Sequence, residues 1–142
     1  MVSLELSPGR TYMGKINGDR DLLEAMNGFC LKNHIRLGRI DAIGSVKRAV
    51  VGFYDQQVRQ YKWIEFAKPL EIIALTGNIS LKENTPFVHA HITLSDERGV
   101  VVGGHLATGT IVFACEFIIR EYVGASLDRA LDGETGLPLW AI

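Results

Sequence analysis

Three of the four histidines of this 142-residue chain lie within one segment, and their type and spacing could bind a metal ion. His89 and His91 are separated by one residue, and His105 follows later in the same segment. Successive side chains of a β-strand point to opposite faces, so a strand through this segment puts His89 and His91 on the same face. Neutral imidazole is a ligand of zinc, and it also suits iron, copper and nickel. Three imidazoles with one coordination position left open are typical of a catalytic zinc site.

The turn between the histidines decides whether His105 reaches the other two. Gly99 suits the left-handed position after a type I turn, which favours a three-residue hairpin loop at 97–99 and places His91 opposite His105. A four-residue loop would shift the register by one residue and turn His105 toward the core, and a bulge at 103–104 would also change the count. We therefore predict a three-residue loop that brings three imidazoles together. The alternative is two surface histidines beside an unrelated glycine-rich turn, because short motifs often occur without function.

Two glutamates interrupt apolar strands and are candidate bases. A buried carboxylate without a partner is costly, so Glu71 and Glu116 each need a partner or an exposed face. The structural explanation is a strand edge or an ion pair with Arg10, Lys47 or Arg120. The functional explanation is that one of the glutamates orients a ligating histidine or acts as general base on a metal-bound water.

The composition is that of an ordinary globular protein, with 47% hydrophobic and 22% charged residues. The length suffices for one core, and we expect a single domain over residues 1–142. The net charge of -1 provides no general attraction to nucleic acid or to an anionic membrane. We expect no membrane-spanning segment and no secretory signal. Cys30 and Cys115 lack CxxC spacing and are typical of reduced, buried cysteines in a cytoplasmic protein.

The apolar periodicity predicts one helix and many strands. The helix opens at Asp19 as N-cap, carries an apolar stripe at helical spacing, and ends near His34, whose position suits the helix dipole. A turn is predicted at 7–9 and another at 132–136. A period of two, or an apolar β-branched run, predicts strands at 10–16, 37–43, 46–54, 58–66, 70–76 and 110–122.

The run at 70–76 is apolar enough to be a central strand buried on both faces. The tail after residue 127 is expected to pack across the sheet or against an adjoining subunit. Together these elements predict an α+β fold built on a mostly antiparallel β-sheet.

The histidine segment resembles the signature hairpin of a known family, the plants and prokaryotes conserved domain, or PPC domain. The hairpin is PFVHAHITLSDERGVVVGGHL at 86–106. Further segments fall in the family's order and spacing over nearly the whole chain, at 9–10, 21–23, 42–45, 52–55, 69–72, 75–80 and 132–136.

The resemblance implies a fold, an assembly and a site. The fold is an antiparallel sheet flanked by one or two helices, and the assembly is a homotrimer. The site is a metal ion, zinc first, held by His89, His91 and His105. Prokaryotic members are often described as DNA-binding by analogy with plant members, which carry an AT-hook with an Arg-Gly-Arg-Pro core. This chain lacks that core, and its segment KPLEII at 68–73 differs from the Gly-Arg-Phe-Glu-Ile-Leu segment that plant members use for partner contacts.

The sequence leaves three functions open. The first is a homotrimeric PPC-domain protein with a three-histidine metal site and a DNA-associated or regulatory role. The second is a metal-dependent enzyme of hydrolase or lyase type on a small molecule, with Glu71 or Glu116 as base. The third is a structural trimer in which the histidines lie at a subunit interface and the metal is a staple. In each case we expect a cytoplasmic protein without membrane attachment.

Overall fold

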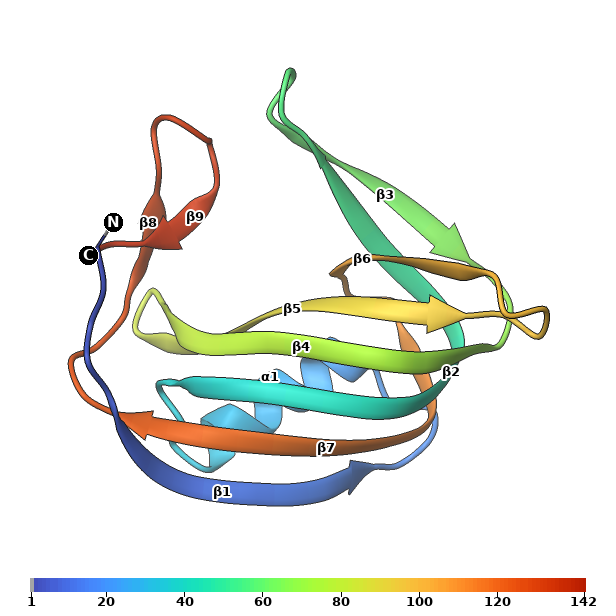
Figure 1. Cartoon of the computed structure of the whole chain (residues 1–142), viewed down its shortest axis with the longest axis horizontal. Helices are drawn as coiled ribbons and strands as arrows, with labels where there is room; N and C mark the ends of the chain where they lie inside the picture. The colour runs from blue at the N-terminus through green and yellow to red at the C-terminus, as the bar shows by residue number, and fades with distance from the viewer. Residues whose placement is uncertain (1) are drawn as a thin grey trace.

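A curved antiparallel sheet with one helix against it makes up most of the computed structural model, which describes residues 2–142 (Figure 1). The sheet has seven strands in the order β1-β7-β2-β4-β5-β6, and β3 pairs with the outer part of β2. Strands β8 and β9 form a separate hairpin. The elements are β1 (Ser7–Ile16), α1 (Leu22–Lys32), β2 (Gly38–Asp55), β3 (Gln60–Phe66), β4 (Leu70–Lys82), β5 (Thr85–Ser95), β6 (Val101–Leu106), β7 (Ile111–Val123), β8 (Arg129–Leu131) and β9 (Pro138–Trp140).

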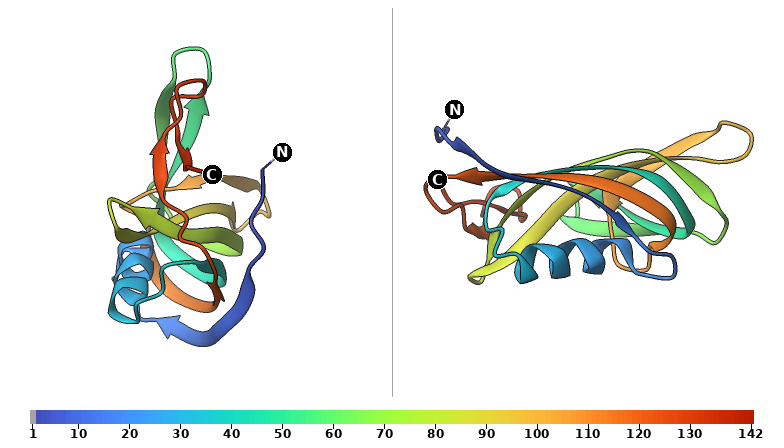
Figure 2. Two further views of the ribbon diagram at one scale, coloured as in Figure 1. Left: turned by 90° about the vertical axis from the view of Figure 1, so that its left-hand side faces the viewer. Right: turned by 90° about the horizontal axis from the view of Figure 1, so that it is seen from below.

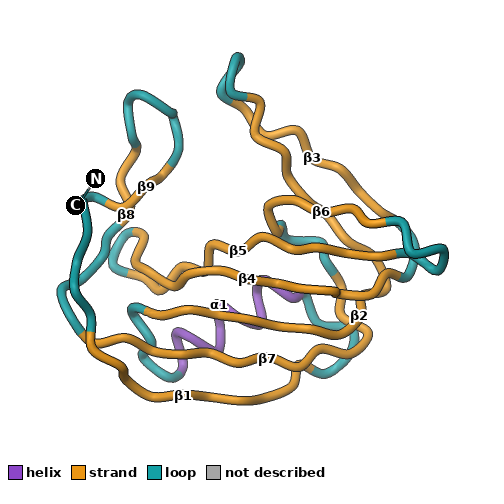
Figure 3. Tube along the Cα trace, viewed as in Figure 1, coloured by secondary structure: helices purple, strands orange, loops and turns teal. Residues whose placement is uncertain are grey.

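The predicted, mostly antiparallel sheet is confirmed, and the described residues contain one helix (Figure 3). Helix α1 lies against one face of the sheet, as the right-hand view of Figure 2 shows. Its buried face, Leu22, Met26 and Cys30, packs into a core formed by alternate residues of the strands. The opposite sheet face is therefore left to the other alternate residues, which include the histidines. In the part of the chain that the structure describes, no helix is long and apolar enough to cross a membrane.

The N-cap of α1 is Asp21, two residues later than predicted. Its Oδ1 accepts the backbone N–H of Glu24 at 3.0 Å, and its Oδ2 accepts that of Gly109 at 2.6 Å. Asp19 instead has a left-handed backbone, with φ of 65°, and its carboxylate binds Lys47 Nζ at 2.6 Å. Both aspartates suit a cap by sequence, but only Asp21 also accepts a hydrogen bond from the loop that precedes β7.

Strand β2 continues through Gly44, where two separate strands were predicted. Gly44 has a φ of 145°, and the register with β4 shifts between Ala42 and Gly44. The glycine therefore bends one long strand without ending it, which lets the first half pair with β4 and β7 and the second half with β3 and β6.

Two other expectations about strands were wrong. Residues 7–9 begin β1, with a register irregularity between Pro8 and Thr11, and do not form a separate turn. The apolar run at the start of β4 is buried on one face only, because Ile72 is buried while Ile73 is 54% exposed in the single chain. A strand beside a bulge, here between Ile72 and Ala74, can carry apolar residues toward solvent or toward a partner.

Two hairpins project to the same side of the sheet, one formed by the ends of β2 and β3 and the other by β8 and β9 (Figures 1 and 2). Their tips touch. The Tyr54 hydroxyl donates to Thr135 O at 2.8 Å, and Arg59 Nη1 donates to Gly133 O at 3.3 Å. The predicted turn at 132–136 is present at the tip of the second hairpin, so the tail reaches across to the first one.

Candidate metal centre

The β5–β6 hairpin has the register predicted from its loop. The backbone N–H of Asp96 donates to Val100 O at 3.1 Å, and Gly99 has a φ of 75°. His91 lies directly opposite His105, and no register shift interrupts the pairing. The three-residue loop is therefore confirmed, and no bulge at 103–104 turns His105 to the core.

The Asp96 carboxylate holds this loop in place. Its Oδ1 accepts the backbone N–H groups of Arg98 and Val100, each at 3.0 Å, and its Oδ2 binds Lys68 Nζ at 2.9 Å. The Lys68 contact, followed by the Val100 hydrogen bond, holds the pKa of Asp96 below its ordinary value, although burial opposes this. A charged Asp96 thus favours the loop conformation that sets the histidine register.

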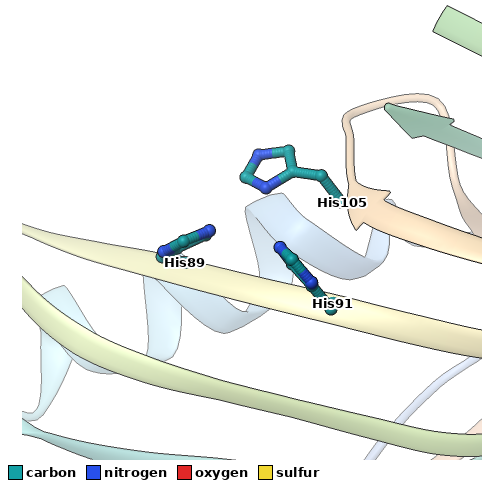
Figure 4. Close-up of side chains that lie close together, drawn as sticks. All are labelled: His89, His91 and His105. Atoms are coloured by element: carbon teal, nitrogen blue, oxygen red, sulfur yellow. The ribbon is translucent and has the colours of Figure 1, made fainter. Parts of the chain in front are cut away.

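The three histidines converge on one place, as Figure 4 shows. One ligand nitrogen from each of His89, His91 and His105 lies within 4.8 Å of the others. The ring centroids are 5.3 Å apart for His89 and His91, 5.0 Å for His89 and His105, and 5.6 Å for His91 and His105. Tetrahedral zinc with its usual bonds to nitrogen separates its ligand atoms by about 3.3 Å, so small side-chain rotations would close the set around an ion.

Burial keeps two of the imidazoles neutral. Burial, then the charge of Arg129 and then the other two histidines lower the pKa of His89 from 6.5 to about 4. Burial is also the main cause of the lowered pKa of His105, ahead of His91 and Arg129. Neutral imidazole is the form that binds a metal ion. In addition, His105 Nδ1 is the one buried side-chain polar atom without a hydrogen-bond partner among the described residues, so the donor set fits a metal ion.

Arg129, from the C-terminal hairpin, braces His89. Its Nη2 lies 3.5 Å from His89 Nδ1 and donates to Asn78 Oδ1 at 2.6 Å. Its Nε donates to Ser80 Oγ at 2.9 Å, and its Nη1 donates to Pro138 O at 2.8 Å. The sequence did not single out Arg129, because no local pattern indicates that the C-terminal hairpin lies beside β4 and brings a side chain to His89.

Aromatic rings brace His105 from the other side. Tyr61 lies 5.0 Å from the His105 ring, stacks on Trp63 at 4.9 Å and contacts Tyr54 at 5.1 Å. Gly52 makes this possible, because a Cβ there would lie 2.7 Å from Trp63 and 2.8 Å from Tyr61. The chain of rings links His105 to the hairpin tip where Tyr54 bonds the tail.

A cavity of about 510 Å³ opens beside His89 and His91. Asn78, Trp140 and Arg39 also line it. An ion held by the histidines would thus face a space large enough for a small molecule.

The two candidate bases lie elsewhere in the chain. Glu71 pairs with Ser95, four residues beyond His91, which is about 13 Å along the strand. Glu116 is on β7, and β2 and β4 separate it from β5, a distance of about 14 Å. Both side chains are exposed in the single chain, so neither carboxylate needs a partner there. The expectation that one of them serves the histidines as a base is therefore corrected, since neither lies beside them in one chain.

The expected ion pairs of these glutamates are also absent from the described residues. Arg10 pairs with Glu121, Lys47 with Asp19, and Arg120 with Asp41. These ion pairs therefore depend on which strands lie side by side, and the local sequence pattern does not reveal that arrangement.

Comparison with known proteins gives one family. Residues 4–123 match the model of the Plants and Prokaryotes Conserved (PCC) domain, the family also written PPC. A metal-containing protein from Archaeoglobus fulgidus is 38% identical, with a TM-score of 0.95 and all of both chains covered. A plant- and prokaryote-conserved protein from Pyrococcus horikoshii is 37% identical, with a TM-score of 0.93, covering 100% of this chain and 98% of that one.

Other similar proteins carry different names. A protein from Bacteroides thetaiotaomicron named as a candidate DNA-binding protein is 28% identical, with a TM-score of 0.85, covering 95% of this chain and 96% of that one. The bifunctional protein GlmU of a Synechococcus strain is 27% identical over 94% of this chain. The chain spans only 20% of that curated relative.

Proposed function

The chain belongs to the Plants and Prokaryotes Conserved domain family, and from this premise we propose that it is a homotrimeric metal-binding protein with a DNA-associated or regulatory role. The observation that carries the metal site is the convergence of His89, His91 and His105 within 4.8 Å. The metal-containing relative from Archaeoglobus fulgidus supports it. Zinc is the first candidate, because three neutral imidazoles with an open position suit zinc.

The experiment that tests the metal site is elemental analysis of untagged protein purified without chelators. We expect about one zinc or similar ion per chain in the wild type and a loss of most of it in His91→Ala, because removing one of three ligands leaves the ion weakly held. His34→Ala is the matched control, since His34 lies after α1, outside the cluster, and should keep the metal. Equal metal in the wild type and His91→Ala, or none in either, would contradict the site.

The DNA-associated role is supported by relatives, including one from Ralstonia eutropha, that are named as candidate DNA-binding proteins. With a net charge of -1, any contact with DNA must be local. We expect retardation of duplex DNA at low salt, and an affinity that falls steeply as salt rises, because each phosphate contact releases counterions. Mobility-shift titration at two or more salt concentrations measures this, and a duplex that stays unbound even at low salt removes this role.

A second candidate function, a metal-dependent enzyme of hydrolase or lyase type, is favoured by the cavity beside the histidines. A bound ion would supply a Lewis acid that polarises a carbonyl or phosphoryl oxygen or activates water. His89, His91 and His105 would hold the ion, and Arg129 would keep the His89 ring in place. Within one chain, neither Glu71 nor Glu116 lies beside these histidines, so a different group would have to transfer any proton.

The homotrimer is supported by apolar side chains that are exposed on the sheet face opposite α1. Met13, Ile43 and Phe113 are 80%, 57% and 64% exposed in the single chain, and Ile73 is 54% exposed. Such a face needs a partner. A trimer in which the metal only staples subunits is the third candidate, and it requires that chelation lower the melting temperature of the assembly.

A further inference from the structure

Arg129 is a half-buried cation whose hydrogen-bond partners are all neutral. Its donors bond Ser80 Oγ, Asn78 Oδ1 and the backbone oxygen of Pro138. Among the described residues, no carboxylate forms a salt bridge with Arg129, whereas three other arginines have one. The positive charge of Arg129 is therefore held in a fixed place and left uncompensated.

Aromatic rings keep this guanidinium at the wall of the histidine cavity. It lies 5.5 Å from the Phe87 ring centroid and 5.9 Å from that of Trp140. Two residues that contact Arg129, Asn78 and Trp140, line the cavity together with His89. The charge thus lies directly behind the cavity wall, where partial burial strengthens its field.

The cavity itself has no acidic side chain on its described lining. Its one lining arginine, Arg39, is already balanced, because its Nη2 lies 2.9 Å from Asp41 Oδ1. Three neutral imidazoles would leave the full double charge of a divalent ion uncompensated. Together with Arg129, the site would then hold three positive charges and no negative one, and uncompensated charge away from water is costly.

We infer that this cavity takes a small anionic ligand, a carboxylate or phosphate oxyanion, which binds beside the histidine-held ion and within the field of Arg129 behind the cavity wall. The inference rests on the proposed metal centre and adds to it the charge class of the ligand. An oxyanion offsets both positive centres at once, since one oxygen can occupy the open position on the ion while the field of Arg129 stabilises the remaining negative charge. Arg129 is thus a specificity-determining residue for anions.

The test uses the full chain loaded with cobalt(II), whose visible spectrum changes when a ligand enters the open position. Inorganic phosphate and acetate are titrated separately, so that the two arms distinguish phosphate from carboxylate chemistry. We expect a saturable spectral change with at least one probe. Arg129→Gln should bind that probe about tenfold more weakly, because it removes one charge near the site, whereas Arg129→Lys keeps the charge and should stay within about threefold of the wild type.

Arg20→Gln is the matched control, because it removes the same charge from an exposed arginine that does not line the cavity. Its anion affinity should match that of the wild type within about twofold. If Arg129→Gln does not fold, Arg129→Met keeps the aliphatic stem between the two rings and takes its place.

The outcomes separate the inference from the proposed metal centre. A wild type that binds cobalt but responds to neither anion overturns the inference and leaves the metal centre standing. So does an equal anion affinity in the wild type and Arg129→Gln, when both carry the same amount of cobalt. A wild type that binds no cobalt overturns the metal centre and this inference with it.

Discussion

Replacing Gly44 with alanine is expected to destabilise the protein by about 3 to 5 kcal/mol, because it combines backbone strain with a steric clash. Gly44 has a φ of 145°, which side chains rarely allow, and an added Cβ would lie 2.2 Å from Ala114 O and 2.8 Å from the Cα of Cys115. These are backbone atoms of the neighbouring strand β7, so no side-chain rotation relieves the contact. The bend that lets β2 serve both halves of the sheet would be lost.

Gly28→Ala is the matched control for the same chemical change. Gly28 lies within α1, and an added Cβ would meet no atom within 4 Å. Alanine there should raise the stability by about 0.5 to 1 kcal/mol, because alanine is the better helix former. Denaturant unfolding of both variants measures the difference. A Gly44→Ala protein that unfolds at the same denaturant concentration as the wild type would show that β2 does not depend on this bend.

Replacing Ile43 with lysine is expected to convert the proposed trimer into monomers. Ile43 is 57% exposed on the sheet face opposite α1, close to Met13, with which it lines one cavity. Burying an isoleucine side chain at an interface contributes about 1.5 to 3 kcal/mol to the free energy of association. In a symmetric assembly the substitution removes this contribution from every subunit and places a charge in the interface instead. The molar mass measured by light scattering in solution should then fall from three times the 15.7 kDa mass of the chain to the mass of a single chain.

Leu31→Lys is the control for this assembly prediction. Leu31 is 56% exposed, almost as much as Ile43, but it lies on α1 at the other face of the sheet. A lysine in the last turn of a helix also suits the helix dipole, so folding should be unaffected. A wild type that is monomeric, or an Ile43→Lys protein that keeps the mass of the wild type, would contradict the assembly through this face.

The histidine site could be predicted largely from local sequence. The alternation around His89 and His91 places both on one face, and Gly99 determines the loop that brings His105 opposite His91. The helix and most strands also follow from their periodicity, because these patterns act within a few residues of the chain. The family resemblance rests on the same local segments.

What surrounds the site depends on tertiary structure. Arg129 reaches His89 only because the tail folds back along β4, and Tyr61 reaches His105 only because Gly52 leaves room for its ring. The separation of Glu71 from the histidines likewise follows from the register between β4 and β5.

The sequence by itself determined the hairpin, the three histidines on it and the alternation that keeps them off the core. Only the tertiary structure decided that Asp21 rather than Asp19 caps the helix, that Gly44 bends a strand, and that a cation rather than a carboxylate stands beside the histidines. The physical reason is the distance along the chain over which each interaction acts. Turn geometry and strand alternation are set by neighbouring residues, whereas caps, bends and charge neighbours are set by whichever distant segment the sheet brings into contact.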